Sequence, residues 1–62
     1  MKEVRNNIAK ELARVCSRSA GKVFNAIQHE RGYKMVEELI IKMMVYEQMT
    51  ISGCIPHINE ML

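Results

Sequence analysis

The segment 34–51 constrains the fold of this chain more than any other part of the sequence. Eleven of its eighteen residues are apolar, and at about 100° per residue they cover nearly the whole circumference of an α-helix. A helix that is apolar on every side is buried on every side. Two other short helices of a 62-residue chain cannot enclose it, so we expect an all-α, intertwined homodimeric helical bundle with this helix as its shared core. The predicted dimer contacts are Val36, Leu39, Ile40, Met43, Met44 and Tyr46.

The length supports the same interpretation. A single domain over residues 1–62 buries only about 60% of the surface of its unfolded chain, and small domains offset this deficit with disulfides, a metal or a partner chain. The two cysteines, Cys16 and Cys54, allow one bridge at most, and the first fifteen residues do not resemble a secretory leader. We therefore expect reduced cysteines, a cytoplasmic location and stabilisation by further copies of the chain. No apolar run reaches the ~20 residues of a membrane span.

Glycine and proline mark the expected ends of the helices. Gly32 follows a partly cationic turn and is typical of the residue that ends a helix, and Gly53 is interpreted in the same way. Pro56 suits the first position of a final helix, where its missing N–H would have no helical partner. Together with a break after residue 17, these residues predict helices near 3–17, 20–31, 34–51 and 56–61.

The break after residue 17 is inferred from a change of apolar face. Residues 4–16 place their apolar side chains in one stripe, whereas those of residues 20–27 lie about 100° away on the same helical wheel. One straight helix cannot turn both stripes toward one core. Two serines and a glycine gather within residues 17–21, where the face changes. The alternative is a single kinked helix over residues 3–31.

Charge is distributed unevenly along the chain. Residues 1–34 hold eight Lys/Arg and three Glu, a net +5, whereas residues 35–62 hold one Lys and four Glu, a net −3. Four cations of the basic half are spaced by four residues and have too few acids beside them, a pattern that suits nucleic-acid phosphates. We predict that Lys10, Arg14, Arg18 and Lys22 bind nucleic acid in a non-enzymatic, homodimeric regulatory protein. The alternative is a solvated face that keeps the protein soluble.

A second functional class is a protein–protein interaction module, such as an inhibitor or adaptor of a larger regulator. Four of the six methionines lie in residues 34–51, and methionine serves adaptable binding surfaces as well as ordinary cores. Lys42 interrupts the apolar run, and we expect its ammonium group to reach the surface or to pair with Glu38, or with Glu47 of another copy. Glu37 and Glu38 are expected in the first turn of their helix, where the dipole favours acids.

The segment Arg14-Val15-Cys16-Ser17-Arg18 resembles the DNA-contacting ribbon of the ribbon-helix-helix regulators. The resemblance covers residues 13–50, because in that family two dimerising helices separated by a glycine follow the ribbon, as residues 20–31, Gly32 and 34–51 would here. It implies an intertwined dimer and a DNA-binding repressor. This chain departs from the pattern in Ser19-Ala20-Gly21, where the first helix would begin, and in a helical apolar pattern that runs through residues 4–16.

Neither a catalytic site nor a metal site is expected. His29 and Glu30 are sequence neighbours, which do not face each other on a helix, and no nucleophile accompanies them. Cys54 and His57 have the spacing of a zinc half-site, but Cys16 and His29 are thirteen residues apart and belong to different predicted helices. We therefore expect no cofactor, with a second copy of the chain, nucleic acid or a larger protein as partner, and no membrane.

Overall fold

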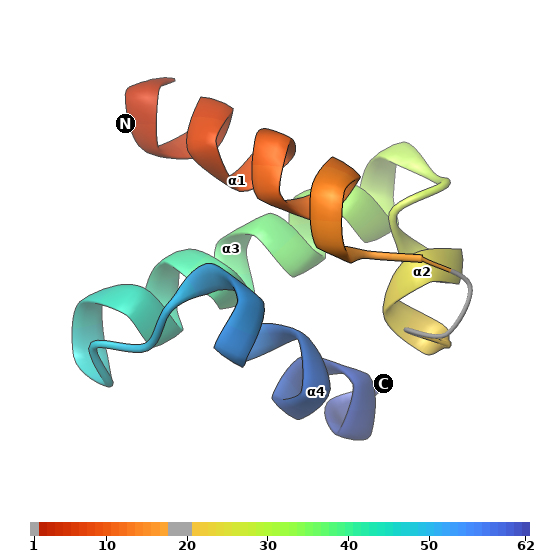
Figure 1. Cartoon of the computed structure of the whole chain (residues 1–62). Helices are drawn as coiled ribbons and strands as arrows, with labels where there is room; N and C mark the ends of the chain where they lie inside the picture. Colours follow the sequence, from red (N-terminus) through yellow and green to blue (C-terminus); the bar gives the residue numbers. More distant parts are fainter. Residues whose placement is uncertain (1, 18–20) are drawn as a thin grey trace.

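The computed structural model describes residues 2–17 and 21–62, and these residues form four helices without any strand. Figure 1 shows the helices folded around one another, with α1 lying across α3. Helices α1, α2 and α4 all pack against α3, and α4 also contacts α1 and α2. The predicted all-α, four-helix class is confirmed. The helices are α1 (Lys2–Val15), α2 (Lys22–Ala26), α3 (Glu30–Tyr46) and α4 (Ile51–Met61).

The predicted break in the N-terminal half is present, so the alternative of one kinked helix over 3–31 is wrong. Helix α1 ends at Val15 and α2 begins only at Lys22. Gly21, directly before α2, has a φ of 63°, a left-handed conformation that is strained for side chains other than glycine. Arg14 and Val15 are helical, so these two residues are not the strand that a ribbon-helix-helix fold would need. Arg18 lies outside the described residues.

Gly32 lies inside α3 and does not end the preceding helix as predicted. His29 has extended backbone angles and acts as the N-cap of α3, two positions before Arg31. Helix α2 ends early because its last carbonyls are taken up by a tight turn, in which the His29 N–H donates to the Ala26 carbonyl over 3.2 Å. The turn brings Ala26 so close to α3 that a Cβ on Gly32 would lie 2.8 Å from the Ala26 carbonyl carbon.

The last two helices also differ from their predicted bounds. Helix α3 ends at Tyr46, because Gln48 adopts a left-handed φ of 54°. Helix α4 begins five residues earlier than predicted, because the Thr50 hydroxyl accepts a hydrogen bond from the Gly53 N–H over 3.1 Å and caps it. Gly53 is therefore part of the first turn, and Pro56 lies inside the helix. The longer α4 provides a covering surface that the sequence interpretation did not include.

All four helices contribute to one core. Helix α1 supplies Ile8 and Leu12, and α2 supplies Val23. The central contribution comes from α3, and α4 completes the core with a cysteine and two isoleucines. The remaining buried apolar residues are Val36, Ile40 and Ile41 of α3 and Cys54, Ile55 and Ile58 of α4.

The rest of the chain covers only one side of helix α3. Val36 and Ile40 are fully buried, whereas Met35, Val45 and Tyr46 keep 44%, 65% and 81% of their surface exposed. The expectation that the chain cannot enclose this helix is thus corrected in part. The chain's own α1, α2 and α4 cover one side of it, and the opposite side remains open within one copy.

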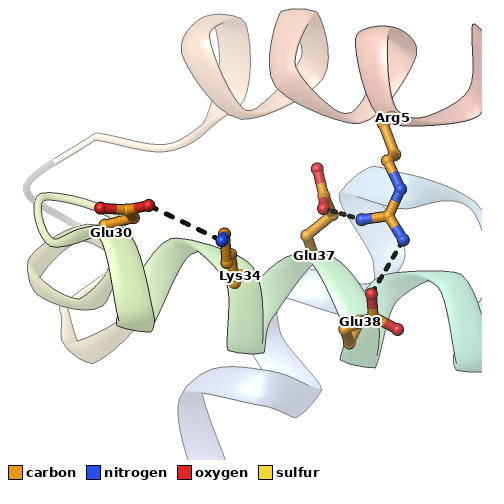
Figure 2. Close-up of polar contacts among 5 residues, drawn as sticks. All are labelled: Arg5, Glu30, Lys34, Glu37 and Glu38. Carbon is orange, nitrogen blue, oxygen red and sulfur yellow. Dashed lines mark hydrogen bonds and ion pairs between the residues drawn. The ribbon is translucent and has the colours of Figure 1, made fainter. Parts of the chain in front are cut away.

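An ion pair joins α1 to α3. The Arg5 guanidinium binds the carboxylates of both Glu37 and Glu38, the latter over 2.9 Å, as Figure 2 shows. Only 9% of the Glu37 side chain is exposed, and a buried carboxylate is tolerated when a cation compensates it. Because α3 begins at Glu30, the two acids lie in the middle of the helix. Their expected placement in its first turn was wrong, and their partner is Arg5.

Asn59 caps α2 from another helix, and this contact gives a prediction. Its side-chain oxygen accepts hydrogen bonds from the N–H groups of Lys22 and Val23 over 2.8 and 3.3 Å, while the preceding Gly21 offers no side chain. An Asn59→Ala variant should therefore lose about 1–2 kcal/mol of stability. Asn59→Asp keeps the acceptor and should stay close to the wild type. Urea unfolding followed by circular dichroism measures both, and equal midpoints for the alanine variant and the wild type would contradict the capping role.

Candidate nucleic-acid interface

The outward face of α1 is polar and solvent-exposed. Ile8 and Leu12 are buried, and Val4 and Val15 pack against the same core, so this side of α1 is fixed inward. The 3.6-residue period then turns the opposite side of the helix to solvent. We call the exposed polar residues of that side the α1 face. They are Lys2, Glu3, Asn6, Asn7, Lys10 and Arg14.

Two of the predicted cations, Lys10 and Arg14, lie on the α1 face one helical turn apart. Arg14 is held by Glu11, which accepts from its Nη2 over 2.7 Å and from its Nε over 3.3 Å. This hydrogen bonding lowers the pKa of the Glu11 carboxyl and raises the pKa of the Arg14 guanidinium. The pair is solvent-exposed and is therefore a weak one, from which a phosphate can displace the carboxylate. Lys10 has no ion-pair partner among residues 2–17 and 21–62.

Lys22 belongs to a neighbouring part of the same end of the molecule. It is the first residue of α2, which follows the C-terminal end of α1 in Figure 1. Its Nζ donates to the main-chain oxygen of Leu62 over 3.0 Å. The structure thus brings Lys10 and Arg14 together, places Lys22 beyond the end of their helix, and does not describe Arg18.

The sequence interpretation missed two residues of this face, Asn6 and Asn7. Both are exposed, and Asn6 lies four residues from Lys2 and four from Lys10. Asparagine amides form paired hydrogen bonds with adenine edges in the major groove. Their signal in the sequence is the helical spacing of polar residues along the outer side of α1, which a search for cations alone does not detect.

The sequence also predicted dimer contacts on α3. In the structure these residues fall into two groups that differ in burial. Val36 and Ile40 are fully buried within the single chain. Leu39, Met43 and Met44 are half-buried at the border of the core, and Tyr46 is exposed. For all six residues, contact with a second copy stays a prediction.

The chemistry of the cysteines and histidines is limited by their placement. Burial raises the pKa of both the Cys16 and the Cys54 thiol, which lowers the fraction of reactive thiolate. The Cys54 thiol is also hydrogen-bonded to the Thr50 carbonyl oxygen over 3.1 Å. In the described part of the chain, no three potential metal ligands gather in one place, and no pocket is present.

None of the described helices is long and apolar enough to cross a membrane. Comparisons of the chain with models of protein families, with curated proteins and with solved structures found no match.

Proposed function

We propose that the protein is a non-enzymatic, homodimeric regulatory protein that binds duplex DNA through the α1 face. The observation that carries this proposal is the exposure of Lys10 and Arg14 on one side of a rigidly packed helix, together with Asn6 and Asn7. Lysine and arginine bind the phosphate backbone, and asparagine binds base edges. The packing of Ile8 and Leu12 holds this helix in place while its outer side stays free.

The geometry of nucleic acids favours DNA over RNA as the duplex. The major groove of B-form DNA is wide enough to admit an α-helix, whereas the major groove of an RNA duplex is too narrow for side chains to read. Helix α1 has fourteen residues, which at 1.5 Å per residue is about 21 Å. This length is enough to follow the groove for several base pairs.

A salt titration tests the proposal. We expect the affinity for a labelled DNA duplex to fall steeply as salt is raised, because each phosphate contact releases a counterion and adds about −0.9 to the logarithmic slope. A Lys10→Ala variant should therefore bind more weakly, with a slope about one unit shallower. Fluorescence anisotropy at several salt concentrations measures both quantities.

The matched control is Lys34→Ala, which removes an exposed lysine from α3 and leaves the α1 face and the other lysines intact. Measured at a protein concentration that keeps the oligomeric state constant, it should preserve the wild-type slope. Asn6→Ala should reduce discrimination between duplexes of different sequence, with a smaller effect on the salt slope. An affinity that hardly changes with salt would contradict the proposal. It would favour the alternative function, an inhibitor or adaptor that binds another protein.

A further inference from the structure

The open side of α3 carries a regular apolar stripe. Met35, Leu39, Lys42 and Tyr46 are spaced by four, three and four residues, the spacing with which helices pair side by side. Val45 borders this stripe and is 65% exposed. We call these five residues the α3 stripe. Exposed large apolar residues that gather in one place mark interaction sites. In this stripe Met35, Val45 and Tyr46 are exposed, while Leu39 is partly buried against the core.

The single charge in the α3 stripe is the best guide to its occupant. Lys42 has no ion-pair partner among the described residues, although Glu38 lies four residues before it on the same helix. One carboxylate oxygen of Glu38 accepts from Arg5, and the other is turned away from Arg5 in Figure 2. With its side chain 56% exposed, Glu38 can accept a second cation from outside the chain.

From this arrangement we infer that a second copy of the chain covers the α3 stripe, with the two α3 helices antiparallel. If the two-fold axis passes between residues 40 and 41, Met35 lies opposite Tyr46 of the second copy. Lys42 lies opposite Leu39 of that copy, next to its Glu38. Each lysine thereby gains an acidic partner, and the pairing is repeated by symmetry.

The positive charge of Lys42 also disfavours a parallel pairing of the two α3 stripes. In register, it would place Lys42 against Lys42 of the second copy, and like charges that meet in an interface suppress association. The stripe from Met35 to Tyr46 extends over eleven residues, or about 16 Å of helix. A contact of this size lies at the lower end of protein interfaces, so we expect a reversible dimer.

This inference deepens the proposed function and rests on it in one respect, the use of two α1 faces at once. Arg5 ties α1 to the flank of α3 that carries Glu38. A two-fold axis between antiparallel helices keeps the same flank of both on one side of the dimer. Both α1 helices therefore lie on one side, where their α1 faces can engage one duplex.

Sedimentation of the full chain over a range of concentrations tests the dimer. We expect a reversible change from monomer to dimer mass, and we expect Lys42→Glu to weaken it about tenfold or more, because the new acid would meet Glu38 of the second copy. Lys10→Glu is the matched control with the same charge change on α1, and it should leave the dimer intact. A monomer at all concentrations, or equal effects of the two variants, would overturn the inference.

Disulfide trapping tests the orientation. Mixed Met35→Cys and Tyr46→Cys chains should form a linked heterodimer on mild oxidation, whereas Met35→Cys alone should not exceed the wild type. The native Cys16 and Cys54 give a low background because their thiols are half-buried and buried. Linkage of Met35→Cys chains to each other would show a parallel dimer and overturn the arrangement. The arrangement would also be overturned if the chain were monomeric and its α3 stripe bound a helix of a different protein.

The DNA-binding and dimerisation experiments test separate hypotheses, and either hypothesis can be refuted without the other. Lys10→Glu should abolish binding to DNA while the dimer persists, whereas Lys42→Glu should weaken the dimer and leave the α1 face of each copy unchanged. A wild-type chain that forms the dimer but does not bind DNA would contradict the proposed function alone. A DNA-binding monomer would contradict the dimer alone.

Discussion

A Gly32→Ala variant is expected to lose about 3 kcal/mol of stability and to be only marginally stable at room temperature. Within a helix, this change normally gains about 1 kcal/mol. Here the new Cβ would lie 2.8 Å from the carbonyl carbon of Ala26 and still closer to its oxygen. These are backbone atoms of a tight turn, so α2 and α3 would have to move apart. Overpacking of this kind costs about 1–3 kcal/mol or more, against a total of about 3–5 kcal/mol for a domain of this size.

Gly53→Ala is the matched control, because it makes the same change in the first turn of α4. Its Cβ would meet the Thr50 hydroxyl oxygen at 3.0 Å, and a side-chain atom can shift where a backbone carbonyl cannot. We expect its stability to stay within about 1 kcal/mol of the wild type. Thermal unfolding followed by circular dichroism compares the two. A Gly32→Ala variant as stable as the wild type would show that α2 and α3 do not approach so closely.

An Ile40→Ala variant is expected to lose about 2–5 kcal/mol, the range for truncating a buried isoleucine. Ile40 is fully buried in the core of a single chain, so the loss should be the same at low and high protein concentration. If Ile40 were instead a contact between copies, the destabilisation would change with concentration. Chemical unfolding at two concentrations well apart, followed by circular dichroism, separates the two cases.

The control on the same helix is Val45→Ala. Val45 is 65% exposed, and truncation of an exposed side chain usually changes stability by less than about 0.5 kcal/mol. A large loss at Ile40 with a negligible one at Val45 would establish that α3 has a covered side and an open side. Comparable losses at both positions would contradict the packing described above.

Local signals in the sequence predicted the helical class, four helices and the break after α1. Residues 4–16 and 20–27 place their apolar residues on different faces, and that mismatch is a local property which no tertiary contact has to supply. The same periodicity predicted which side of α1 faces the core. It therefore also predicted that Lys10 and Arg14 are exposed. The exposure of Asn6 and Asn7 could have been predicted in the same way from their positions on the helix.

The helix ends predicted near Gly32 and Gly53 were wrong, because glycine has structural roles other than ending a helix. At Gly32 the missing side chain makes room for the Ala26 carbonyl, a contact between two helices that no local pattern records. At Gly53 the Thr50 hydroxyl starts a helix where an end was predicted. The resulting α4 covers part of α3, so the estimate of how much apolar surface the chain could bury was too low.

The sequence by itself determined that the chain is helical, where its basic half lies and that 34–51 has more apolar surface than one side of a helix requires. Only the tertiary structure decided which of those apolar residues belong to the chain's own core. Val36 and Ile40 are enclosed, whereas Met35, Val45 and Tyr46 remain exposed. The physical reason is that periodicity gives the direction of a side chain around its own helix, while burial depends on which other helices arrive on that side.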